Sequence, residues 1–227
     1  MTAPAITVVL PVYNRAKTVA ATIASVLAQD WPDFELVVVD DCSTDGSAAV
    51  VASLTDARIR TVRQPENRGP SAARNRGVIE ARAPLISFVD SDDLFLPHKL
   101  GFVKRYFDAN PDIEVLIDSF EILYPRFAHW KRRAARTNPD LRDSAAIECA
   151  VLDRTAYKAT PAISARRQTL IDAGLFDEAL RRREDMDIVL RLTQCARVAM
   201  TSELLWRKFH TRGSLSAQLD TFIPTVI

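Results

Sequence analysis

The sequence predicts one α/β domain, Rossmann-like, in which helices flank a mostly parallel central sheet. Short apolar runs rich in β-branched residues alternate with segments of helical character over residues 1–110, which is typical of parallel strands joined by crossover helices. Acidic residues follow two of these runs directly, at the edge where ligands bind in such sheets. The 227 residues, 48% of them hydrophobic, suffice for a single core.

In the first half of the chain, three predicted strands are short apolar runs closed by a proline or an aspartate, and the third in order, at residues 59–62, is a short strand bounded by Arg and Gln. The first predicted helix carries Val19, Ile23 and Val26 at a spacing that places one face on the sheet. The strands are predicted at residues 6–10, 34–39, 59–62 and 85–89, and the helices at 18–28, 46–54 and 71–81.

The second half is predicted to mix strands and helices less regularly. Gly174 is expected to cap the end of one helix, because glycine tolerates the left-handed conformation found there. Three helices are predicted: one from about residue 97 to 110, a second that ends at 173–174, and a third from 186 to about 194. Strands are predicted inside 113–123 and at 161–166, 198–200 and 204–210.

A basic segment at residues 126–142 lacks apolar periodicity and is expected to be a mobile excursion from the fold. A solvated loop is the favoured interpretation. The alternative is that the segment binds a phosphate-bearing acceptor or an anionic membrane face, through Arg126, Lys131, Arg132, Arg133 and Arg136.

Three aspartates, Asp90, Asp92 and Asp93, follow the apolar run at residues 85–89. In extended chain, residues two apart point the same way, so Asp90 and Asp92 are expected to converge. Convergent carboxylates favour a hard divalent cation, Mg²⁺ or Mn²⁺, completed by water and phosphate oxygens. For Asp93, capping of the next helix is an equal alternative.

The overall charge and the cysteines narrow the class of protein. Thirty basic and 29 acidic residues leave a net charge of +1, so we expect no nucleic-acid partner. Three widely spaced cysteines favour reduced thiols, and neither a signal peptide nor an apolar run of about 18 residues is evident. The protein is expected to be cytoplasmic, with the inner face of the membrane as a candidate location.

Several motifs occur along the chain in a characteristic order. They are Pro11-Val-Tyr-Asn-Arg15, Val39-Asp-Asp41 with Ser43 and Asp45-Gly-Ser47, Ala73-Arg-Asn75 with Gly77, Asp90-Ser-Asp-Asp93, and Glu184-Asp185. Together they resemble the family 2 inverting glycosyltransferases of the A-type fold, over residues 6–216. The resemblance implies a single nucleotide-diphospho-sugar transferase domain over residues 1–227, with a nucleotide-binding half at 1–110, an acceptor-binding half at 111–216 and a tail at 217–227.

The resemblance also implies how the donor nucleotide is bound. Pro11 and Tyr13 match the loop that lines the nucleotide, where Tyr13 would contact the base or ribose unless it is a structural tyrosine. Asp41 matches the acid that accepts a hydrogen bond from the base, a role suited to uracil or thymine. Arg74 matches an arginine near the base and phosphates, and Asp90 a residue that binds ribose or metal-bound water.

The catalytic and metal roles follow from the same resemblance. Asp92 matches the direct ligand of Mn²⁺ or Mg²⁺, with Asp90 beside it, and His210 matches a histidine that reaches the metal or diphosphate in some members. Asp185 matches the base that deprotonates the acceptor, with Glu184 as the second candidate and helix capping as the alternative. A helix N-terminus and the arginines at 181–183 are expected to keep Asp185 ionised and weakly basic.

The predicted function is metal-dependent, inverting transfer of a sugar from a UDP- or dTDP-linked donor to a hydroxyl of a glycan or lipid-linked acceptor. One alternative is a related domain that binds nucleotide or glycan without turnover. A phosphatase of the haloacid dehalogenase type is a weaker alternative, because its nucleophilic aspartate normally follows the first strand. A dinucleotide-binding oxidoreductase is disfavoured, since residues 11–15 contain no glycine.

Overall fold

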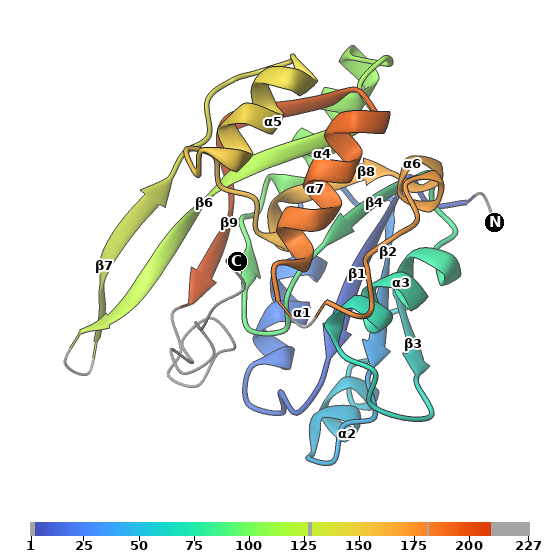
Figure 1. Ribbon diagram of the computed structural model, residues 1–227. Helices are drawn as coiled ribbons and strands as arrows, with labels where there is room; N and C mark the ends of the chain where they lie inside the picture. The colour runs from blue at the N-terminus through green and yellow to red at the C-terminus, as the bar shows by residue number, and fades with distance from the viewer. Residues whose placement is uncertain (1–2, 127–128, 181, 210–227) are drawn as a thin grey trace.

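The computed structural model describes residues 3–126, 129–180 and 182–209 of the chain, and its core is a nine-stranded sheet (Figure 1). The strand order is β3-β2-β1-β4-β8-β6-β9-β5, with β7 paired to β6. The strands are β1 (Ile6–Val12), β2 (Phe34–Asp40), β3 (Ile59–Arg63), β4 (Leu85–Phe88), β5 (Leu94–Phe95), β6 (Val115–Arg126), β7 (His129–Arg136), β8 (Ile163–Arg166) and β9 (Val198–Phe209). The helices are α1 (Val19–Leu27), α2 (Ser47–Ala52), α3 (Pro70–Glu80), α4 (Lys99–Ala109), α5 (Ser144–Leu152), α6 (Arg167–Asp172) and α7 (Glu184–Cys195).

The predicted fold class is confirmed. β1 to β4 are parallel, β6 and β9 run in the same direction, and β5, β7 and β8 run against them. β1 and β2 are buried along their whole length, because helices cover both faces of a parallel sheet. This burial explains why the first strands appear in the sequence as uninterrupted apolar runs.

The sequence suggested that Pro11 belongs to the loop after the first strand, but Pro11 lies inside β1. Val9 faces β4, since its carbonyl accepts the N–H of Val89 at 3.1 Å. Pro11, two residues on, faces the same side at a level where β4 has already ended. The missing proline N–H therefore costs the sheet no hydrogen bond.

The second half differs from the prediction in three places. The basic segment is not simply a loop: residues 129–136 form β7, which pairs with β6 in a hairpin that projects from the rest of the molecule (Figure 1). Helix α5 was missed, although Asp143 caps it by accepting the N–H groups of Ala145 and Ala146. β9 also runs unbroken where two strands were predicted.

Close packing joins α3 to the sheet at Gly77. A Cβ atom added at Gly77 would overlap Cγ1 of Val9 on β1. Glycine is therefore required by the short distance between helix and strand, and not by its backbone conformation.

A buried ion pair joins the two halves of the fold. Lys99 of α4 and Asp118 of β6 are both fully buried and in direct contact, and Lys99 also donates to the carbonyl of Pro161 at 3.0 Å. Burial raises the pKa of Asp118 to about 7 and lowers the pKa of Lys99, although each charge partly counteracts the other's shift. None of the helices in the described part of the chain combines the length and apolar character needed to cross a membrane.

Candidate functional site

The carboxyl ends of β2 and β4 bring two acidic segments to the same edge of the sheet. Both strands pair in parallel with β1, so the chain leaves them on the same side. Asp41 follows β2, and residues 90–93 follow β4. This is the edge at which ligands bind in open parallel sheets.

The three aspartates after β4 form a cluster with excess negative charge. Burial, followed by repulsion from Asp90, raises the pKa of Asp92, and Arg15 at 3.8 Å only partly offsets this. Burial raises the pKa of Asp93 well above its ordinary value, and repulsion from Asp90 adds to the rise. The nearby cations therefore do not neutralise the cluster.

Asp93 does not cap a helix. Helix α4 begins at Lys99 without any side-chain cap, whereas Asp93 accepts the backbone N–H of Phe209 at 3.3 Å. The carbonyl of Asp93 accepts the hydroxyl of Thr22 on α1 at 2.9 Å. Asp93 thus ties the acidic segment to the end of β9 and to α1.

The donor set of the cluster fits a hard divalent cation. Within residues 3–126, 129–180 and 182–209, no three His, Cys, Asp or Glu side chains are placed to hold a metal ion. Mg²⁺ commonly takes only one or two carboxylates and fills its remaining positions with water and phosphate oxygens. Asp92 and Asp90 offer such a pair, and a cation between them is favoured because Asp90 raises the pKa of Asp92 more than Arg15 lowers it. His210 lies outside the described residues.

Arg74 connects the acidic segment to the start of α7. Its buried guanidinium donates to Asp90 at 2.8 Å and to Glu184 at 3.1 Å, and lies over the ring of Phe176. Burial by itself would lower the pKa of Arg74, but the two carboxylates more than offset it and raise the pKa. The pairing brings together two of the predicted site segments that are 110 residues apart in the sequence.

The pKa of Asp185 is raised, whereas the sequence predicted a weakly basic carboxylate. It lies in the first turn of α7, with Arg183 as the capping residue, and its Oδ1 accepts the N–H of Met186 at 2.8 Å. Burial and then repulsion from Glu184 raise its pKa, while Lys158 and Arg74 lower it less. The expected weakening of its basicity was wrong, because burial and Glu184 outweigh the helix end and the neighbouring cations.

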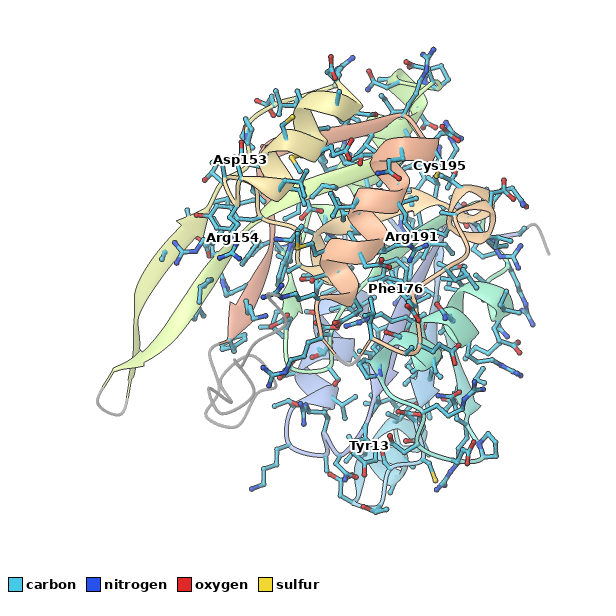
Figure 2. All side chains as sticks on the ribbon, in the orientation of Figure 1. Tyr13, Asp153, Arg154, Phe176, Arg191 and Cys195 are labelled. Atoms are coloured by element: carbon cyan, nitrogen blue, oxygen red, sulfur yellow. The ribbon has the colours of Figure 1, made fainter. Side chains whose placement is uncertain are left out.

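The proposed nucleotide side is built around Asp41. Its carboxylate is buried and accepts hydrogen bonds from Gln64 at 2.6 Å and from the backbone N–H groups of Arg68 at 2.9 Å and Gly69 at 2.8 Å. These contacts use three of the roughly four lone-pair positions of a carboxylate, which leaves room for one further donor. Tyr13 is 43% exposed at the edge of the molecule near α2, as a residue that contacts ligand requires (Figure 2).

The prediction missed side chains whose role depends on folding. Arg15 lies beside Asp92, Lys208 lowers the pKa of Asp92, and Lys158 lowers the pKa of Asp185. No local pattern marks Lys158 or Lys208, since each meets its aspartate only across strands or loops. Arg15 and Asn75 are the exceptions, because they belong to the motifs that also supply Tyr13 and Arg74.

Comparison with known proteins supports the resemblance to family 2 glycosyltransferases. The family model for glycosyl transferase family 2 matches residues 7–169. The chain is similar to the succinoglycan biosynthesis protein ExoO of Rhizobium meliloti, with 34% identity over 95% of this chain and 64% of that protein. It is 30% identical to the uncharacterized protein MT1568 of Mycobacterium tuberculosis, over 93% of this chain and 69% of that protein.

The fold is similar to that of S. aureus TarS residues 1–349, crystallised in complex with UDP-GlcNAc. The TM-score is 0.76 at 26% sequence identity, over 92% of this chain and 60% of that one. The chain thus spans less than two thirds of ExoO and of this TarS fragment. Because the family model covers most of the length of the chain, the protein belongs to glycosyl transferase family 2.

Proposed function

We propose that the protein transfers a sugar from a nucleotide diphosphate donor to an acceptor hydroxyl, with inversion at the anomeric carbon. The observation that carries this proposal is the bridge from Asp90 through Arg74 to Glu184. It links the acidic segment expected to hold the donor diphosphate to the helix that carries Asp185. Nucleotide binding is assigned to residues 1–110 and acceptor binding to residues 111–216.

On the donor side, Asp41 accepts a hydrogen bond from the base, and Pro11 and Tyr13 line the nucleotide. Asp92, with Asp90 beside it, would hold Mn²⁺ or Mg²⁺, and His210 is a further candidate ligand. A cation bound there would supply positive charge toward the leaving diphosphate. Arg15 and Lys208 lie beside these carboxylates and add positive charge on the same side.

On the acceptor side, Asp185 takes the proton of the attacking hydroxyl. Its raised pKa makes it a stronger base than an ordinary carboxylate, which suits proton removal during attack. Because Oδ1 accepts the N–H of Met186, we assign the acceptor proton to Oδ2. Glu184 is the weaker candidate for the base, since it is paired with Arg74.

The relatives suggest the class of substrate. The TarS complex contains UDP-GlcNAc, which favours a UDP-linked donor, with a dTDP-linked donor as the alternative. ExoO is named for succinoglycan biosynthesis and Bacillus subtilis TuaG for teichuronic acid biosynthesis, so we propose a glycan or lipid-linked acceptor. A cytoplasmic site of action, with peripheral contact to the inner membrane face through residues 126–142, remains part of the proposal.

A thermal-shift panel tests donor and metal together. UDP with Mn²⁺ at about 100 times its Kd is expected to raise the melting temperature by about 5–10 °C, from the linkage relation and the size of the chain. UDP without metal, or GDP with metal, should give a smaller shift. In Asp92→Ala the Mn²⁺-dependent part should disappear, and a shift that survives this substitution would refute the metal assignment.

A further inference from the structure

Asn75 holds the segment between α6 and α7 through its side-chain amide. Its Nδ2 donates to the carbonyl of Phe176 at 2.8 Å and to Glu178 at 3.1 Å, and its Oδ1 accepts the N–H of Phe176 at 2.9 Å. Asn75 is buried, and Figure 2 shows Phe176 beside the N-terminal part of α7. A paired amide contact of this kind fixes the direction of the backbone as well as its position.

The ring of Phe176 is held separately from its backbone. It packs edge-on against Phe88 at 5.4 Å between ring centroids, and the guanidinium of Arg74 lies over it at 5.6 Å. Burial of the ring would keep the segment against α3 without the amide. The hydrogen bonds of Asn75 therefore add orientation to a contact that apolar packing already stabilises.

Both ends of this segment are also fixed. At its start, Arg191 of α7 donates to the carbonyls of Ala173 and Leu175, the latter at 2.7 Å. At its end, Glu184 is paired with Arg74. Leu175 and Arg183 have positive φ angles of 62° and 61°, which non-glycine residues adopt only where the surroundings enforce them. Asn75 thus holds residues 176–178 between these two anchored ends, and Asp185 follows the second of them.

The same segment also reaches the proposed nucleotide side. Glu178, which accepts the Asn75 amide, pairs with the side chain of Arg68 at 2.7 Å. The backbone N–H of Arg68 donates to Asp41. Asp41, the carboxylate assigned to the nucleobase, is therefore linked through Arg68 and Glu178 to the segment that precedes α7.

We propose that Asn75 is a positioning residue for Asp185: it orients the segment that ends in the first turn of α7 and so sets where the base meets the acceptor hydroxyl. This inference rests on the proposed function, because it assigns Asp185 as the base. Asn75 itself touches neither substrate nor the reacting atoms. Its loss leaves the Glu178–Arg68 pair and the hydrogen bond from the Arg68 N–H to Asp41 in place, so turnover should fall while donor binding stays unchanged.

The test compares Asn75→Ala with the matched control Thr7→Val. Thr7 is also buried and makes two side-chain hydrogen bonds, to Glu35 at 2.7 Å and from the N–H of Ala83 at 3.2 Å, but it lies near the amino end of β1. UDP affinity with Mn²⁺ is measured by calorimetry, and turnover as release of UDP from UDP-GlcNAc. Asn75→Ala should lower kcat by up to about 10²-fold, the cost of a roughly 1 Å misplacement, with the Kd for UDP unchanged.

Thr7→Val should lower the melting temperature and leave kcat near the unmodified value. Equal losses of kcat in the two variants, or a proportional loss of UDP affinity in Asn75→Ala, would overturn the proposal. Asn75→Asp replaces Asn75→Ala if the latter does not fold, since it keeps the volume and the acceptor for the Phe176 N–H. The expectations for it are the same.

Hydrogen exchange provides a readout that does not depend on activity. The hydrogen-bonded amides of Met186 and Asp187 should exchange faster in Asn75→Ala by about tenfold or more and stay unchanged in Thr7→Val, because only the first substitution loosens the start of α7. Unchanged exchange in Asn75→Ala would overturn the positioning role. If the unmodified protein releases no UDP while the exchange result holds, the donor or the proposed function is wrong and the positioning of the segment stands.

Discussion

Replacing Lys99 with methionine isolates a fully buried carboxylate, and the structure limits how much this can cost. Lys99 and Asp118 are both 0% exposed, so water does not screen the pair. Removing one partner of a buried pair typically destabilises a protein by about 3–5 kcal/mol. The variant can lower this cost by protonating Asp118, whose pKa is already about 7 with Lys99 present and whose ordinary value is 3.8.

Protonation of Asp118 sets an upper limit on the loss of unfolding free energy in Lys99→Met, and this limit depends on pH. At about pH 7.5, protonating a carboxyl of pKa 3.8 costs about 5 kcal/mol, from 1.36 kcal/mol per pH unit. At about pH 5.5 the same cost is about 2.3 kcal/mol. Since Lys99 lowers the pKa of Asp118, its removal raises that pKa further above the unfolded value. The stability of the variant is then greatest at low pH and decreases as pH rises.

The measurement is urea unfolding of the unmodified protein and Lys99→Met at both pH values, with Lys99→Met/Asp118→Leu as the control. The unfolding free energy of Lys99→Met should fall by up to about 2.7 kcal/mol from the lower to the higher pH, and that of the unmodified protein by about 1.9 kcal/mol, because its Asp118 titrates near pH 7. The loss caused by the substitution should therefore be larger at the higher pH by roughly 1 kcal/mol. The double variant should be more stable than the single one by about 1–4 kcal/mol, since no unpaired charge remains. A loss that does not depend on pH, or a double variant as unstable as the single one, would refute the reasoning.

Three further predictions concern the site and its support. Asp185→Asn should lower turnover by about 10²- to 10⁴-fold while the calorimetric affinity for UDP with Mn²⁺ stays near normal, and near-normal turnover would move attention to Glu184. Asp41→Ala should reduce the preference for UDP over GDP, and it should also lower the melting temperature because the N–H groups of the following loop lose their acceptor. Equal binding of UDP and GDP by the unmodified protein would contradict the base role. Gly77→Ala should cost about 1–3 kcal/mol in urea unfolding, and Val9→Ala in the same chain should recover part of it, because the added Cβ overlaps the valine side chain.

The secondary structure of the first half could be predicted because its signals are local. Residues 6–10 and 34–39 are buried on both faces, so their apolar character is visible without knowledge of the partner strands. β7 could not be recognised in the same way. Its run of basic residues resembles a solvated loop, and its strand conformation depends on pairing with β6, an edge contact that leaves no periodicity in the sequence.

The sequence by itself determined the family, the parallel sheet and the acidic residues that follow its strands, because motif order and hydrophobic periodicity are properties of neighbouring residues. Tertiary structure alone decided which charges meet. Arg74 pairs with Glu184 across 110 residues, and the pKa of Asp185 is raised mainly by burial and by Glu184. The physical reason is that burial and ion pairing depend on distance in space, which the chain fixes only when its strands and helices pack.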